Sequence, residues 1–196
     1  TRGEAVSPIQ AVEWIRALAD AMDYAHRQDV VHRDLKPSNV ILDRSGRPLI
    51  TDFGLAKRLD RDHGLTRTGT LMGTVSYMSP EQAAGRSRSA GPASDIYSLG
   101  AMLYELLTGR PPFRKESLQA TLFSIAEDVP KAPSKLNPRV PRGLEAICLK
   151  CLEKPVERRY ATAGDLAEDL RRFLDHEPIR ARPISAIRRL GHWVWR

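Results

Sequence analysis

The sequence has 196 residues and a mass of 21.9 kDa, which fits one domain of about 100–200 residues, alone or with a tail. Apolar residues make up 41% of the chain and charged residues 28%, a composition that can bury a core and excludes a disordered chain. Two cysteines exclude a disulfide framework and favour a reducing compartment. The longest apolar run, Ile96 to Leu107, is broken by polar residues and is shorter than the roughly 20 residues of a membrane span. A cytoplasmic protein is therefore expected, and the net charge of +7 leaves an anionic partner open.

The first predicted element is a helix over residues 8–27. Ser7 is expected to cap it, Pro8 suits its first position, and Gln10 is expected to reach back as in a capping box. Apolar residues then recur at helical spacing, at Val12, Ile15, Ala19, Met22 and Ala25.

Two short runs of residues that favour strands, 40–42 and 49–51, predict a β-hairpin with its turn at Ser45-Gly46. With a two-residue turn, Asn39 would lie directly opposite Asp52 at the open end of the hairpin. An amide and a carboxylate side by side suit Mg²⁺, which binds carboxylates together with phosphate oxygens and water. Alternatively, both residues only cap the strand ends.

Residues 52–94 show little periodicity and predict a long functional loop. Asp95 is expected to cap a second helix that runs to Thr108 and ends at Gly109. That helix is apolar on nearly every face, which indicates burial on all sides. Further helices are expected near 116–126, 142–153 and 163–175. The pair Cys148 and Cys151 lacks a second metal-binding pair, so we interpret it as buried and structural.

Four stretches of the chain resemble the motifs of protein kinases. They are the catalytic loop His32–Asn39, the metal motif Asp52-Phe53-Gly54, the end of the activation segment Gly73–Glu81, and the start of the central helix at Asp95. The whole is similar to bacterial eukaryotic-type Ser/Thr protein kinases. This resemblance implies a protein-kinase-like α+β fold over residues 1–176: a mainly α-helical C-terminal lobe with a small β-hairpin at the catalytic site and no N-lobe.

The resemblance also implies the roles of site residues. Asp34 would be the catalytic base, Lys36 would contact the transferring phosphate of ATP, and Thr74 would help select Ser/Thr hydroxyls of protein substrates. Asn39 and Asp52 would hold Mg²⁺. The expected nucleotide contacts come from Lys36, Asn39, Ile41 and Asp52.

Other residues are expected to support the site. Structural roles are expected for His32, Phe53, Gly54, Glu81, Asp95 and Arg159. Asp95 would accept backbone N–H bonds from the catalytic loop, and Glu81 would pair with Arg159.

Regulation by phosphorylation is expected as well. Arg33 would sense a phosphate on the activation segment, with Thr66 and Thr68 as the phosphosites. Alternatively, both threonines are ordinary polar loop residues.

The glycine-rich loop, strand lysine and helix glutamate of a complete kinase are absent from the sequence. The chain alone is therefore expected to transfer phosphate poorly without the N-lobe. The alternative is a truncated lobe that serves as a non-catalytic binding or scaffold module. Coding sequence upstream of residue 1 would discriminate between the two.

Residues 177–196 form a basic tail with five Arg and one Glu, and with tryptophans near its end. Such a tail is typical of a juxtamembrane segment at the cytoplasmic face, next to an anionic membrane surface. A solvated basic linker is the alternative. We do not expect nucleic-acid binding, because no recognition motif accompanies the charge.

Overall fold

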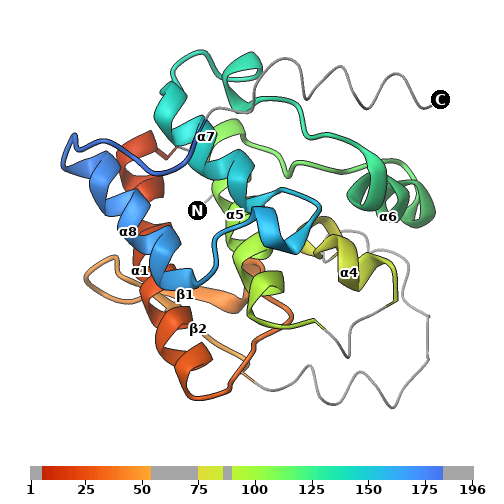
Figure 1. Cartoon of the computed structure of the whole chain (residues 1–196), viewed down its shortest axis with the longest axis horizontal. Coiled ribbons are helices and arrows are strands. Elements are labelled where there is room, and N and C mark those ends of the chain that lie inside the picture. The colour runs from red at the N-terminus through yellow and green to blue at the C-terminus, as the bar shows by residue number, and fades with distance from the viewer. Residues whose placement is uncertain (1–5, 54–74, 86–89, 183–196) are drawn as a thin grey trace.

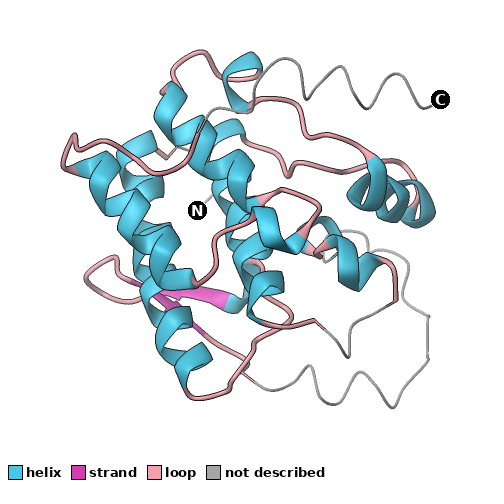
Figure 2. Cartoon of the chain, viewed as in Figure 1, coloured by secondary structure: helices cyan, strands magenta, loops and turns pink. Residues whose placement is uncertain are grey.

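The computed structural model describes residues 6–53, 75–85 and 90–182, and its fold is mainly α-helical with one small antiparallel sheet (Figures 1 and 2). The α-helices are α1 (Pro8–Arg27), α4 (Pro80–Ala83), α5 (Pro92–Thr108), α6 (Leu118–Glu127), α7 (Arg142–Cys151) and α8 (Ala163–Leu174). The strands are β1 (Val40–Leu42) and β2 (Pro48–Ile50). Short 3₁₀ helices are η1 (Pro37–Asn39), η2 (Val75–Tyr77), η4 (Pro133–Lys135) and η5 (Val156–Arg158). The predicted helices near 8–27, 116–126, 142–153 and 163–175 are confirmed.

Helix α5 lies in the middle of the molecule and packs against α1, α7 and α8 (Figure 1). Its start differs from the expected one: Gly91 is the N-cap and Pro92 the first helical residue, so Asp95 lies inside the first turn. Proline at the first helical position was the missed signal. The expected end is confirmed, since Gly109 caps the helix with φ 75°, a left-handed conformation that favours glycine.

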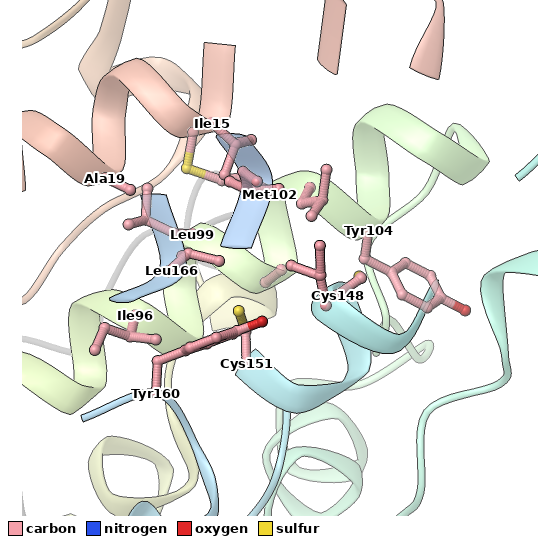
Figure 3. Close-up of a cluster of buried hydrophobic side chains, with 14 of the residues drawn as sticks. Ile15, Ala19, Ile96, Leu99, Met102, Tyr104, Cys148, Cys151, Tyr160 and Leu166 are labelled. Carbon is pink, nitrogen blue, oxygen red and sulfur yellow. The ribbon is translucent and has the colours of Figure 1, made fainter. Parts of the chain in front are cut away.

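The core fills the space between α5 and its neighbours, with Ile15, Leu99, Met102 and Leu166 among its side chains (Figure 3). Helix α7 packs closely against α5 at Gly100. A Cβ atom built on Gly100 would lie only 2.3 Å from the Cβ of Cys151, so a larger residue would not fit there. Cys148 and Cys151 are both fully buried, as expected. Burial raises the pKa of the Cys151 thiol to about 12, so this thiol stays protonated at neutral pH.

Helix α1 begins at the predicted cap but without the full capping box. Ser7 Oγ accepts a hydrogen bond from the Gln10 N–H at 3.1 Å. The Gln10 side chain, expected to reach back, instead donates to Glu13 Oε2 at 3.1 Å. The Gln10 side chain thus binds the Glu13 carboxylate instead of the N-cap backbone, which it would bind in a capping box.

The hairpin forms, but its predicted register is wrong by one residue. Val40 pairs with Ile50 and Leu42 with Pro48, so Asn39 lies opposite Thr51 rather than Asp52. The turn is longer than expected: Asp43 N–H donates to Arg47 O at 2.9 Å, and Gly46 has φ 83°. A three-residue turn with glycine in the left-handed position shifts the register relative to a two-residue turn.

The segment 52–94 is less irregular than predicted, because it contains η2, α4 and the first residues of α5. The signal for α4 is a capping box: Ser79 Oγ accepts the Gln82 N–H at 3.4 Å, and the Gln82 side chain accepts the Ser79 N–H at 3.0 Å. The sequence Ser79-Pro80-Glu81-Gln82 therefore indicates a short helix at the end of the Gly73–Glu81 motif.

Tyr97 gives a first testable prediction. Its ring is fully buried, and its hydroxyl oxygen has no hydrogen-bond partner among the described residues. Because an unsatisfied buried hydroxyl destabilises a fold by about 1–3 kcal/mol, Tyr97→Phe is expected to leave the free energy of unfolding unchanged or raise it by up to about 1 kcal/mol. Urea unfolding of both proteins measures this. A clear loss of stability would show that the hydroxyl has a partner.

The C-terminal end of the described chain packs against the helices. Ala181 is buried in the core and Ile179 packs against the core, so residues 177–182 lie on the lobe rather than in a tail separate from it. The expected membrane-adjacent residues beyond 182 lie outside the described part of the chain. Within residues 6–53, 75–85 and 90–182, no helix has the length and apolar character that crossing a membrane requires.

Candidate active site

One carboxylate of α5 binds the backbone of the loop between α1 and β1. Asp95 is fully buried, and its side chain accepts the backbone N–H of His32 at 2.9 Å and of Arg33 at 2.8 Å. These are the backbone contacts that the resemblance led us to expect. A third contact comes from His26 Nε2, which lies 2.9 Å from Asp95 Oδ2. The loop is thus fixed where Arg33 adopts φ 65°, a conformation that a non-glycine residue rarely adopts unless its surroundings impose it.

His32 connects this loop to the chain that follows β2. Its Nδ1 accepts the backbone N–H of Asp34 at 3.3 Å, and its Nε2 lies 2.9 Å from Thr51 O. Since a carbonyl can only accept, Nε2 carries the proton and the ring is in one tautomer. The Phe53 ring stands edge-on to His32 at 5.1 Å but remains 44% exposed, so Phe53 packs less completely than expected.

Two polar side chains of the same loop donate hydrogen bonds to Asp34. Lys36 Nζ donates to Asp34 Oδ2 at 2.7 Å, and Asn39 Nδ2 donates to Asp34 O at 2.8 Å. Because both Asp34 atoms can only accept, the amide nitrogen of Asn39 must face Asp34. The amide oxygen of Asn39 then points away from Asp34 and is left for another ligand.

The residues at the open end of the hairpin fit a magnesium ion. Asp52 is exposed, and the adjacent Thr51 N–H donates to Asn39 O at 2.9 Å, which keeps both side chains at one end of the hairpin. Asp52 has φ 62°, a left-handed conformation that aspartate tolerates better than most residues. Amide and carboxylate oxygens are ligands that Mg²⁺ accepts. No group of three or more His, Cys, Asp or Glu in the described part could hold a metal alone, so phosphate oxygens and water would have to complete the shell.

A buried ion pair anchors α4 to the helical core. Arg159 Nη1 donates to Glu81 Oε1 at 2.8 Å, and Arg159 Nη2 donates to Glu81 Oε2 at the same distance. The Arg159 side chain is fully buried. Burial alone would raise the pKa of Glu81, but the hydrogen bond and charge of Arg159 outweigh it and hold that pKa below its ordinary value. The expected Glu81–Arg159 pair is therefore present.

Helix α4 also contacts the loop between α1 and β1. Gln82 Nε2 donates to Arg33 O at 2.6 Å, and Arg33 Nε donates to Ala90 O at 3.2 Å. Helix α4 therefore contacts both the loop that carries Asp34, through Gln82, and Arg159, through Glu81.

Two residues of this arrangement were missed in the sequence. His26 continues the buried face of α1 one turn after Met22, and its place on that face was the available signal. Gln82 was signalled by the capping box with Ser79.

The hairpin presents apolar side chains on both of its faces. Ile41 pairs with Leu49, and they are 52% and 41% exposed. The opposite face borders an apolar cavity of about 660 Å³, which Val40, Leu42 and Pro48 help to line. The remaining predicted site residues, Gly54, Thr66, Thr68 and Thr74, lie outside the described residues.

A mainly helical lobe with a two-stranded hairpin and this loop geometry defines a protein kinase fold. The protein kinase domain family matches residues 1–170, and the chain belongs to this family.

Similar proteins are bacterial serine/threonine kinases by name. One is a probable serine/threonine-protein kinase of Streptomyces coelicolor, 39% identical over 180 residues, which are 91% of this chain and 26% of the relative. The serine/threonine-protein kinase PknB of Mycobacterium tuberculosis is 37% identical over 177 residues, 90% of this chain and 28% of the relative. A probable PknB of Lactococcus lactis is 42% identical over 162 residues, 82% of this chain and 25% of the relative. The chain therefore spans about a quarter of the length of these relatives.

Proposed function

We propose that this chain is the catalytic C-terminal lobe of a serine/threonine protein kinase that transfers the γ-phosphate of ATP to hydroxyl groups of proteins. The observation that carries the proposal is the Asp34 carboxylate, held by Lys36 Nζ at 2.7 Å on a loop that Asp95 fixes. Phosphoryl transfer depends mostly on positioning and charge stabilisation, so a few well-placed polar groups suffice.

Each polar group of the loop has a place in this chemistry. Asp34 accepts or orients the proton of the attacking hydroxyl, and Lys36 stabilises charge on the transferring phosphate. The amide oxygen of Asn39 and the carboxylate of Asp52 hold Mg²⁺. When bound, Mg²⁺ neutralises charge on the phosphates of ATP. Thr74 is proposed to favour Ser and Thr hydroxyls.

An N-lobe elsewhere in the protein is proposed to complete the nucleotide site. The exposed pair Ile41 and Leu49 supports this, because two large apolar side chains on one face of a hairpin favour a covering partner. Ile41 is proposed to contact the nucleotide from this face.

The activation segment is proposed to be a phosphorylation switch. Arg33 uses Nε for Ala90 O, so its other guanidinium N–H groups are proposed to bind a phosphate on Thr66 or Thr68. For the basic chain beyond Arg182 we propose contact with the anionic cytoplasmic face of a membrane.

The proposal is tested by phosphate transfer from Mg·ATP to a generic Ser/Thr protein substrate. The product of the whole gene and the 196-residue chain are assayed side by side. We expect transfer by the whole-gene product and little by the chain alone. If the whole-gene product is folded but silent, even after activation-segment phosphorylation is supplied, the lobe is a binding or scaffold module instead.

A further inference from the structure

Residues 177–182, here called the strap, follow the part of the chain that the kinase family matches, yet they are built into the lobe. One carboxylate holds their backbone: Asp169 Oδ1 accepts the Arg180 N–H at 2.6 Å, and Asp169 Oδ2 accepts the Ala181 N–H at 2.9 Å. Asp169 is fully buried. Ile179 lies against α7, where its Cδ1 is 3.4 Å from a Cβ built on Gly143. The strap is therefore seated by apolar packing and by a buried anion.

The same carboxylate binds Tyr160. Asp169 Oδ2 accepts the Tyr160 hydroxyl proton at 2.7 Å, and the ring of Tyr160 is nearly buried within the core cluster (Figure 3). Lys150 Nζ lies 4.1 Å from the centre of that ring, which is a cation–π contact. Tyr160 directly follows Arg159 in the sequence. Tyr160 binds Asp169, which holds the strap, and Arg159 binds Glu81 of α4.

Arg159 has little freedom to adapt to a shift of its neighbour. Besides Glu81, its guanidinium donates to the carbonyl oxygens of Ala93, Glu153 and Lys154 at 2.8–3.0 Å. A displacement of the backbone at residue 160 would therefore lengthen several of these bonds together. If the strap leaves, Asp169 loses two of its three donors and is driven toward water, since a buried carboxylate requires hydrogen bonds. Its remaining partner, the Tyr160 hydroxyl, would move with it.

We propose that Asp169 and Tyr160 are positioning residues for the activation segment: the seated strap holds Tyr160, and Tyr160 with Arg159 holds Glu81 of α4. This inference rests on the proposed kinase function. It assigns a role in substrate docking to residues that touch neither nucleotide nor catalytic loop. The chain that follows the lobe thereby influences the segment that receives the protein substrate.

The test uses four variants of the whole-gene product: two single variants, the double variant that combines them, and a control. Ile179→Asp unseats the strap, and Tyr160→Phe removes only the linking hydroxyl. The control is Asp165→Asn, because Asp165 pairs with the strap residue Arg180 at the surface, where both side chains are about half exposed. Two quantities are measured: KM for a peptide substrate beside KM for Mg·ATP, and hydrogen exchange of the α4 amides relative to those of α1.

We expect Ile179→Asp and Tyr160→Phe each to raise the peptide KM about threefold or more, with KM for Mg·ATP unchanged. The α4 amides should exchange faster while α1 keeps its protection, and the control should match the wild type. The double variant should resemble either single one, because the link is already broken.

Three results would overturn the inference. One is an unchanged peptide KM, and another is loss of protection that is equal in α1 and α4, which indicates general destabilisation. The third is a double variant whose effects add, because the strap would then act by another route. If the wild-type protein transfers no phosphate, the proposed function fails, while the exchange comparison still decides whether the strap positions α4.

Discussion

Replacing Arg159 with alanine is expected to lower the free energy of unfolding by about 3–5 kcal/mol, because it removes a fully buried guanidinium and leaves the largely enclosed Glu81 carboxylate without its cation. The loss extends beyond the ion pair, since Arg159 also satisfies the carbonyl oxygens of Ala93, Glu153 and Lys154. Helix α4 should be the first element to open. Denaturant unfolding followed by circular dichroism measures the change.

The neighbouring Arg158 provides a matched control. It is exposed, so Arg158→Ala is expected to change stability by less than about 0.5 kcal/mol. The ion pair also predicts a pH dependence. The pKa of Glu81 is lower in the folded state, so its stabilisation is present above the pKa of the unfolded state and is lost as the pH falls through the folded-state pKa. In acid, therefore, the difference in stability between wild type and Arg159→Ala should narrow by the share that the ion pair contributes, while the share due to the three carbonyl oxygens remains. A difference that stays constant would contradict this account of the pair.

Replacing Asp95 with alanine is the second large effect, and it acts on both stability and catalysis. The substitution removes the acceptor for the buried N–H groups of His32 and Arg33 and for His26 Nε2. Each group left unsatisfied costs about 1–3 kcal/mol, so a total loss of about 3 kcal/mol or more is expected. The loop that carries Asp34 would also lose the support for the left-handed conformation of Arg33. We expect kcat to fall together with stability.

Denaturant unfolding and peptide phosphorylation by the whole-gene product measure both effects. Asp20→Ala serves as the control, because the contact of Asp20 among the described residues is an exposed pair with Arg16 on α1, worth about 0.3–0.5 kcal/mol. An Asp95→Ala protein with normal kcat and normal stability would show that the loop is fixed by other contacts.

Local sequence signals predicted most of the helical elements well. The cap at Ser7, the stop at Gly109 and the helical spacing of apolar residues each act within a few residues, so they can be read directly. The register of the hairpin could not be obtained in this way. It depended on whether the turn closes over two or three residues, and the hydrogen bond from Asp43 N–H to Arg47 O decided for three.

The site itself was predictable only in part. Asp34, Lys36 and Asn39 lie within one short loop, and the structure brings them together as the motif led us to expect. The contacts of His26 and Gln82 span 69 and 49 residues of sequence and depend on how α1, α4 and α5 pack. No local pattern fixes such pairs. The direction of the Asn39 amide likewise became clear only from its contact with Asp34 O.

The most direct test of the central claim is the rate of phosphate transfer from Mg·ATP to a Ser/Thr peptide by the whole-gene product and its Asp34→Asn variant. Asp43→Asn is the matched control, because Asp43 lies in the exposed hairpin turn away from Asp34. If Asp34 acts on the proton of the substrate hydroxyl, kcat falls by about 10²–10⁴-fold, while the control keeps the wild-type rate. An Asp34→Asn protein that transfers phosphate as fast as the wild type would contradict the assignment of this loop as the catalytic site.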